Sequence, residues 1–439
     1  MTRTGPTAVA TSLSEFAAVA GTSAPSDRAS GARQAMSRRT FLRRAGIGAG
    51  AIVAVAGVGG GWRAWDQGVF IPETGDAYGA WSASLLGSGQ MPLVNAAILA
   101  ANAHDTQPWR FVVANDQIDL YADRSRSMGA MDPVRREMDM SLGCALENLV
   151  LTARANGLAP TVTLLPDASE PNFIARVHLT TEVPDRSPLF EAIPKRHTNR
   201  GAFAAGRRID PEILGQAAAL VDTSMTGLIW LDADPARSRF GRLTIDATAA
   251  IVADPEMARD DFAWYRQDWG EIQRRKDGIT IDTAGLDEPM RIIVRLLPPS
   301  DRRTMQQGWL EATATRHVPT AAAFGLLSVR DRADTAQRIE AGRLFERVHL
   351  FATTRGLALQ PLNQVFERID RETTSGLTPT FNAGDPGSCS RRTAGARGIP
   401  SRLWDYPTRS GSAAPGHRCH LAILRALRRA RSPHTTARS

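Results

Sequence analysis

Residues 141–158 read SLGCALENLVLTARANGL, and residues 340–357 read EAGRLFERVHLFATTRGL. The two segments align without gaps at an offset of 199 residues and share six identities. The shared residues are Gly143, Glu147, Leu151, Ala153, Gly157 and Leu158, which recur as Gly342, Glu346, Leu350, Ala352, Gly356 and Leu357. Both segments place apolar residues at helical spacing and end at a glycine suited to a left-handed C-cap. The sequence therefore predicts two copies of one helix, although two unrelated amphipathic helices could also resemble each other by chance.

Shorter elements surround each copy of this helix. Alternating apolar residues on both sides of an Asn-Asp turn indicate a hairpin before the first copy, and a similar apolar run precedes the second copy. The predicted elements are helices over 92–101 and 211–221, and strands over 109–114, 117–121, 161–165, 227–231 and 323–329. Helices and strands are mixed in both parts of the chain, which indicates an α+β fold.

The repeat divides the body of the chain into two related parts. We expect a tandem duplication, with a first half over residues 63–185 and a second half over residues 186–388. Within the second half, residues 260–307 are rich in aromatic and charged side chains and have no counterpart in the first half. This segment is expected to be a lid-like insertion that covers a pocket.

The formal net charge of +8 is concentrated at the two ends of the chain. Residues 1–44 carry +5 and residues 389–439 carry +10, which leaves −7 for the middle. Because the folded part has no basic excess, no nucleic-acid partner is expected. From Cys389 onward the chain is rich in Arg, Ser, Gly and Pro and lacks an amphipathic pattern, so we expect an aberrant, disordered tail there. The cysteines and histidines are too scattered to predict a metal site.

The N-terminal region carries a targeting pattern. Residues 37–44 read SRRTFLRR and precede 17 uncharged residues, 45–61. A basic region followed by an apolar one is typical of a twin-arginine export signal, although a buried Gly/Ala-rich helix after a chance Arg pair would look similar. We therefore expect residues 1–62 to direct export by the Tat translocase to the periplasm or cell envelope. The apolar stretch is short for a membrane span but could act as an uncleaved anchor.

Three motifs follow one another along the chain. They read ANAHDTQPWRF at 101–111, RHTNR at 196–200 and QPL at 360–362. The first resembles the flavin-binding turn of nitroreductases, and the second resembles the Arg-rich opening that binds the FMN phosphate in that family. With the twin-arginine leader, these motifs make the chain similar to the Acg-type, FMN-binding branch of the nitroreductase superfamily over about residues 78–370.

The resemblance implies a site for FMN. Arg196 and Arg200 would offer bidentate donors to the phosphate, and the turn held by Pro108 would contact the isoalloxazine ring. Asp105 stands where the family usually has Asn, which replaces a donor with a group that only accepts at neutral pH. The predicted cofactor-binding residues are Asn102, His104, Asp105, Thr106, Gln107, Arg196, Thr198, Asn199, Arg200, Gln360, Pro361 and Leu362.

Each motif taken alone also has a purely structural interpretation. Residues 107–109 could start a strand with a buried Trp, residues 196–200 could be a solvated helix start, and residues 360–362 could link a helix to a core strand. Only their common order along the chain favours FMN over these alternatives.

The symmetry of the two halves is incomplete. Residues 315–322 read TRHVPTAA and lack the Gln-Pro-Trp sequence, while residues 78–90 lack an Arg-rich opening. In nitroreductases the two elements of a flavin site come from opposite subunits. We therefore expect one FMN per chain, held in a monomeric intrachain pseudo-dimer. The family's closing strand and Arg-containing tail are not recognisable in residues 389–439, so a swapped strand and one phosphate-side Arg are expected to be missing.

Two functions fit this pattern. The first is an oxidoreductase that passes electrons through FMN to a nitro, quinone or similar acceptor. The second is a non-enzymatic protein that stores or sequesters FMN beneath the insertion. The flavin itself carries the chemistry, so we assign no catalytic side chain, and the electron donor and acceptor stay unknown.

Overall fold

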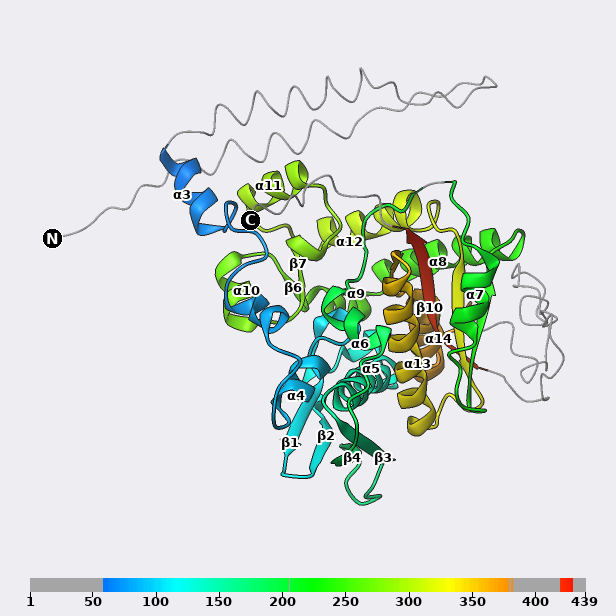
Figure 1. The fold of residues 1–439 in the computed structure, drawn as a ribbon. Coiled ribbons are helices and arrows are strands. Elements are labelled where there is room, and N and C mark those ends of the chain that lie inside the picture. The colour runs from blue at the N-terminus through cyan, green and yellow to red at the C-terminus, as the bar shows by residue number, and fades with distance from the viewer. Residues whose placement is uncertain (1–57, 205, 379, 382–418, 429–439) are drawn as a thin grey trace, which may run out of the picture. The chain divides into compact units, whose positions relative to one another are not determined.

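Two helices of 20 residues, α5 (Arg136–Ala155) and α13 (Thr335–Thr354), pack side by side at the centre of the computed structural model (Figure 1). They are the two predicted copies, and Gly157 and Gly356 follow their ends with φ of 75° and 65°. Glycine enters this left-handed region without the steric cost that other residues meet there, as the C-cap prediction requires. The sequence thus predicted both helices and how each one ends.

A close crossing fixes how these helices pack. A Cβ atom added to Gly143 would overlap the carbonyl oxygen of Ile339, and one added to Gly342 would overlap that of Met140. The contact is reciprocal, because the residue pairs 140/339 and 143/342 both differ by 199. Two helices related by a two-fold axis would make such a contact. The duplication itself remains a prediction.

The structure describes residues 58–204, 206–378, 380–381 and 419–428. From residue 60 onward, the described residues belong to one compact unit, to which the description below refers. The predicted twin-arginine segment, 37–44, lies outside the described residues. In the described ranges, no helix combines the length and apolar character needed to cross a bilayer.

Eight of the described strands form two four-stranded antiparallel sheets. The first sheet has the strand order β1-β2-β4-β3, and the second has the order β5-β8-β10-β9. Apolar side chains from both sheets, such as Ile118 and Leu327, pack into the same core as the two central helices. The strands are β1 (Trp109–Val113), β2 (Gln117–Ala122), β3 (Leu158–Leu164), β4 (Phe173–Thr181), β5 (Thr226–Leu231), β8 (Phe324–Val329), β9 (Leu357–Leu359) and β10 (Cys419–Arg428).

Strand β10, at residues 419–428, is a regular element in a segment where the sequence analysis expected none. It lies between β8 and β9 and pairs antiparallel with both, with Ile423 opposite Leu326 and Ala426 opposite Leu359. The physical reason is that β8 and β9 each have an edge whose backbone groups need a partner. The apolar run LAIL at 421–424 satisfies that need despite the Arg-rich composition around it.

Aspartate caps begin several of the remaining helices. The side chains of Asp210, Asp254, Asp268, Asp287 and Asp301 accept hydrogen bonds from backbone amides in the first turns of α7, α9, α10, α11 and α12. A cap of this kind stabilises a helix by about 1 kcal/mol. The remaining elements are α3 (Val58–Asp66), α4 (Met91–Ala97), α6 (Pro188–Ala192), α7 (Pro211–Ala218), α8 (Ala236–Ala253), α9 (Pro255–Phe262), α10 (Trp269–Arg275), α11 (Glu288–Leu296), α12 (Arg302–Ala312), α14 (Gln364–Ser375), the π-helix η7 (Thr313–His317), and the short strands β6 (Tyr265–Arg266) and β7 (Ile279–Thr280).

The close crossing predicts the effect of a single methyl group. Gly143→Ala should lower the free energy of unfolding by about 1–3 kcal/mol or more, because α5 and α13 must move apart to admit the new Cβ. Gly308→Ala in α12 is the matched control, since nothing lies within 4 Å of its Cβ position. That control should be neutral or stabilising by about 0.5–1 kcal/mol. Urea denaturation of both variants measures the difference; equal stabilities would contradict the proposed role of the crossing.

Candidate functional site

A cavity of about 380 Å³ lies beside the N-terminal half of α5. All three sequence motifs reach its wall: Asn102 and His104 from the first, Thr198 and Arg200 from the second, and residues 360–362 from the third. Glu137, Ser141 and Cys144 of α5 and Phe345 of α13 complete the inner wall. The cavity is therefore built from both halves and from the central helix pair.

The turn that carries the first motif is held in an unusual backbone conformation. His104, Asp105 and Gln107 have φ of 49°, 52° and 49°, which non-glycine residues seldom adopt. Surrounding contacts maintain it, because Asn102 Oδ1 accepts from the Gln107 amide at 2.9 Å and Ser141 Oγ accepts from the Ala103 amide at 3.1 Å. Backbone strain of this kind persists only where the surroundings impose it, and it is concentrated at functional sites.

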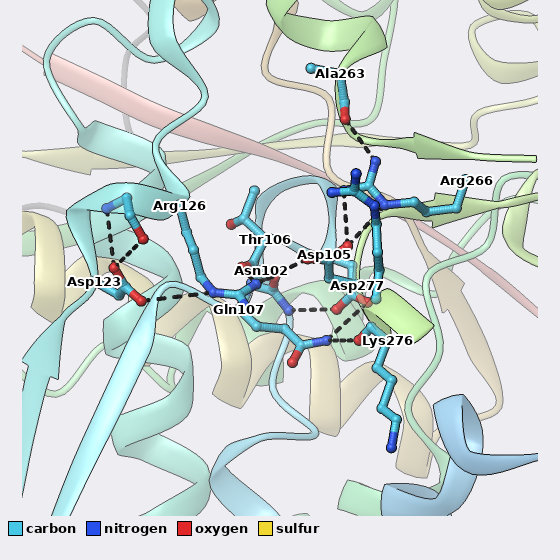
Figure 2. Close-up of polar contacts among 12 residues, drawn as sticks. Asn102, Asp105, Thr106, Gln107, Asp123, Arg126, Ala263, Arg266, Lys276 and Asp277 are labelled. Atoms are coloured by element: carbon cyan, nitrogen blue, oxygen red, sulfur yellow. Dashed lines mark hydrogen bonds and ion pairs between the residues drawn. The ribbon is translucent and has the colours of Figure 1, made fainter. Parts of the chain in front are cut away.

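Polar contacts on the outer side fasten this turn to the insertion (Figure 2). Gln107 Nε2 donates to the Lys276 carbonyl oxygen at 2.6 Å, and the Gly278 amide donates to the Asp105 carbonyl oxygen at 3.1 Å. Arg126 Nη1 donates to the Thr106 carbonyl oxygen at 2.9 Å and contacts Asp277 at 3.2 Å. These residues clamp the turn from outside the cavity.

The clamp differs from the expectation that all five turn residues contact a cofactor. Asn102 and His104 line the cavity, but Asp105, Thr106 and Gln107 do not. The left-handed conformation at Asp105 and Gln107 turns their side chains toward each other and toward Lys276, with Gln107 Nε2 and Asp105 Oδ2 3.3 Å apart. Motif matching cannot detect this difference, because the same residue types could point either into the cavity or away from it.

The Arg-rich motif is divided in the same way. Thr198 forms a parallel bridge to Leu359, and the Asn199 amide donates to the Leu359 carbonyl oxygen at 3.0 Å, which brings the second motif beside the third. Arg200 lines the cavity and donates from Nη1 to the Thr283 carbonyl oxygen at 3.2 Å. Asn199 does not line it, since its Oδ1 accepts from the Gly201 amide at 3.2 Å.

Arg196, like Asn199, departs from the predicted phosphate site. It is buried away from the cavity, where Nη2 donates to the Leu99 carbonyl oxygen at 2.8 Å and Nε lies 3.3 Å from Glu346 Oε1. Arg196 is buried here because it is the partner of Glu346, a glutamate of the repeated helix. Glu346 is fully buried, and burial raises the pKa of its carboxyl group while the charge of Arg196 lowers it. A buried carboxylate requires such a cation nearby. Glu346 Oε2 also accepts from the Ala101 amide at 3.2 Å, so one carboxylate binds the starts of two motifs.

Two further arginines, Arg266 and Arg316, line the cavity although the sequence analysis did not predict them there. Arg316 lines the wall together with His317 from η7, a π-helical turn that overlaps the segment 315–322. Their approach to Arg200 is shown by the hydrogen bond of 3.0 Å between His317 Nε2 and the Arg200 carbonyl oxygen. Single π-helical turns often occur at functional sites, but no local sequence rule predicts them. Arg200 and Arg316 donate to the carbonyl oxygens of Thr283 and Gly285, which are two residues apart, so both cationic side chains belong to the same part of the wall.

Side-chain amides form another part of the wall. Gln360 Oε1, Asn363 Oδ1 and Gln364 Oε1 are buried and have no hydrogen-bond partner within the described part of the chain. Burying such a group without a partner costs about 1–3 kcal/mol. Amides supply both donors and acceptors, so this wall suits a ligand edge that carries both. Asn363 and Gln364 directly follow the third motif, and this position is the sequence signal that could have identified them as wall residues.

Acidic groups line the wall formed by α5, α9 and α14. His104 Nε2 lies 2.8 Å from Asp261 Oδ1, while Asp261 Oδ2 has no partner among the described residues. Burial, followed by the charge of nearby Glu137, raises the pKa of Glu367 well above its usual value. The protonated form of Glu367 is therefore favoured relative to that of an ordinary glutamate.

The insertion forms the outer wall of the cavity. Asp261, Tyr265, Thr280 and Val294 are among its lining residues. Burial raises the pKa of Tyr265 well above its usual value, and the nearby charge of Asp261 adds to this effect. The phenol accordingly stays neutral and able to donate. The segment predicted to cover a pocket thus supplies residues to the cavity wall.

Comparisons with known proteins identify similar mycobacterial chains. The chain is 27% identical over 298 residues to "Putative NAD(P)H nitroreductase Rv3131" of Mycobacterium tuberculosis, which covers 66% of this chain and 79% of that protein. It is 25% identical over 309 residues to "Uncharacterized protein Rv3127" of the same organism, covering 65% and 82%. It is also 28% identical over 114 residues to "Putative NAD(P)H nitroreductase acg", covering 25% and 34%. These similarities support a relationship to the nitroreductase superfamily.

Two further comparisons complete this set. No protein-family model matches the chain. A solved structure described as a "putative nitroreductase from anabaena variabilis" is 13% identical to this chain, with a TM-score of 0.26. The match covers 71% of this chain and 69% of the chain in that structure.

Asp105 predicts a pH dependence of stability. Burial raises its pKa from 3.8 to about 6, so the folded protein holds a proton there that the unfolded chain has already released. This bound proton stabilises the folded state below about pH 4, and the stabilisation is lost as the pH rises through 6. Asp105→Asn should therefore gain about 1–3 kcal/mol relative to wild type between pH 5 and pH 8.

Thermal melting at pH 5 and pH 8 measures this gain. Asp116→Asn, at an exposed turn position, is the control and should follow wild type at both pH values. If the difference between Asp105→Asn and wild type is the same at pH 5 and at pH 8, the buried carboxyl group does not carry the effect.

Proposed function

We propose that this protein is an FMN-binding oxidoreductase of the nitroreductase superfamily, which passes electrons through FMN to a nitro, quinone or similar acceptor. One observation carries the proposal: three motifs that are spread over more than 250 residues of sequence, from Asn102 to Leu362, converge on a single cavity. Their similarity to flavin-binding motifs rests on the sequence alone, and their convergence in space is an independent observation. Relatives named as NAD(P)H nitroreductases add support.

The residues present fit FMN. In one part of the wall, Arg200 and Arg316 with Thr198 provide the cationic and hydroxyl donors that a phosphate dianion needs. The orphaned amide oxygens of Gln360, Asn363 and Gln364 suit the pyrimidine edge of the flavin, which carries both carbonyls and an N–H group. The cavity volume of about 380 Å³ is within the usual range for small-ligand sites.

Bound FMN would supply hydride and electron transfer. The chain's own contribution would be to orient the ligand, exclude water and hold protons. Burial and the charge of Glu137 favour the protonated form of Glu367 at the wall, while burial and the charge of Asp261 favour the neutral phenol of Tyr265. Reduction of a nitro or quinone group consumes protons along with electrons, so proton-bearing side chains at the cavity wall suit this class of acceptor.

The same cavity supports a monomeric pseudo-dimer with one FMN. Asn102 and His104 come from the first half, whereas Thr198 and Arg200 come from the second. We therefore propose that the duplication brought the two parts of one flavin site into a single chain. We also propose Tat export of this folded protein. Outside the cytosol, the electron donor would have to be one available in the cell envelope.

The central test is to purify the full chain, extract its flavin and mix the protein anaerobically with NADPH. We expect a yellow protein with about one FMN per chain that bleaches when a suitable donor is present. A colourless protein that does not take up added FMN would reject the proposal. A yellow protein that no nicotinamide or quinol donor reduces would instead indicate storage.

Arg200 and Gln364 predict separable effects on ligand affinity. Arg200→Ala should weaken FMN about tenfold or more, because a charge-assisted contact to the phosphate is lost, and should leave riboflavin nearly unchanged. Gln364→Ala should weaken both ligands by a similar severalfold factor, because both present the same ring edge. Arg242→Ala, at an exposed position on α8, is the control for loss of an arginine.

Flavin fluorescence titration of the apoprotein gives all these affinities. Equal losses of FMN and riboflavin affinity on Arg200→Ala would mean that Arg200 supports the fold and does not bind the phosphate.

A further inference from the structure

Exposed apolar side chains gather on two segments that are far apart in sequence. Trp62 and Trp65 of α3 have exposed fractions of 67% and 77%, and Phe70, just after α3, is 68% exposed. A second group lies on and after α11. We call the whole set the α3–α11 face, and its members are Trp62, Trp65, Phe70, Ile71, Met290, Ile292 and Leu297.

Backbone contacts hold the two segments together. Arg63 donates from Nε to the Leu296 carbonyl oxygen at 2.8 Å and from Nη2 to that of Leu297 at 2.6 Å. In return, Arg295 donates from Nη1 to the carbonyl oxygens of Gln67 and Gly68 at 2.7 and 2.9 Å. Arg295 is buried and also lies over the ring of Trp269. The face is therefore a fixed part of the fold and not a frayed chain end.

Such a face is unusual on a water-exposed surface. Large aromatic side chains contribute strongly to burial, and a contiguous exposed group of them marks an interaction site. Trp109, by comparison, is only 8% exposed in the core. The two exposed tryptophans thus indicate a partner that accepts an apolar ring while leaving its N–H group near water.

We propose that the α3–α11 face lies on the surface of a lipid bilayer, with its tryptophans at the headgroup boundary. The chain that leads into α3 gives the first reason, since residues 45–61 carry no charge and follow Arg43 and Arg44. This uncharged stretch leads directly into the apolar side chains of the face. Tryptophan is the residue type most typical of membrane interfaces, because its ring is apolar and its N–H group is polar.

Charge near the face gives the second reason. Arg302 and Arg303 are exposed at the start of α12, five residues or so after Leu297. Arginines beside an apolar surface strengthen binding to anionic headgroups. The face also lies on the outside of the insertion, because Val294 of α11 lines the cavity while Met290 and Leu297 are exposed. This inference does not depend on FMN.

Vesicle sedimentation of the full chain tests the proposal. The vesicles consist of phosphatidylcholine with phosphatidylglycerol, and the variant is Trp62→Ser with Trp65→Ser and Phe70→Ser. Its partitioning should fall about tenfold or more relative to wild type. The matched control is Val112→Ser with Val113→Ser and Val183→Ser, whose side chains are 55%, 43% and 81% exposed elsewhere. This control should bind like wild type, and all the substitutions are at exposed sites that do not support the core.

A fluorescence measurement locates the contact. Lipids with brominated acyl chains should quench part of the wild-type tryptophan emission, and Trp62→Phe with Trp65→Phe should lose that part while still binding. Equal vesicle binding by the two Ser variants would overturn the proposal, since binding would then come from other residues. A concentration-dependent dimer without vesicles, abolished by the face variant, would also overturn it and assign the face to a second copy.

Discussion

The reciprocal crossing of α5 and α13 is the constraint on which the rest of the structure depends. Because Gly143 and Gly342 have no side chains, the two backbones approach until each glycine touches the opposite carbonyl group. At that separation the repeated glutamates face the other half. Glu147 lies 2.9 Å from Arg343 and 3.0 Å from Arg347, whereas Glu346 binds Arg196 and the Ala101 amide. Equivalent residues have thus acquired different partners, and the Glu346 side is the one that bears the cavity.

The cavity gains its character from unlike walls brought together by this crossing. Arg200 and Arg316 provide positive charge, the amides of residues 360–364 provide mixed donors and acceptors, and burial with the charge of Glu137 favours the protonated form of Glu367. None of these groups alone would define a ligand. A dianion, a hydrogen-bonding ring edge and a proton-consuming reaction together describe a narrower class of ligand than any one wall does. The strained turn at residues 104–107 contributes by holding Asn102 and His104 at the boundary between these walls.

The sequence predicted much of this arrangement, and its failures have identifiable causes. Repetition and periodicity correctly indicated α5, α13 and the hairpin of β1 and β2, since these depend on local spacing. Residue type could not decide which of Arg196 and Arg200 would be buried opposite Glu346, because that depends on a contact between residues about 150 positions apart in sequence. The inward position of Arg316 followed from a π-helical turn that no local pattern indicates. Strand β10 was missed because composition outweighed a short apolar run whose partners are distant in sequence.

The position of β10 has a consequence for how the protein is made. Residues 419–428 are synthesised after β8 and β9, yet they lie between these two strands in the second sheet. While the ribosome is still translating, these two strands have no partner on the sides that β10 later occupies, and exposed strand edges invite aggregation. The second sheet can close only after residue 428 has been synthesised. Until then the nascent chain must stay soluble with an open sheet, and a deletion of residues 419–428 would remove an interior strand and not an edge strand.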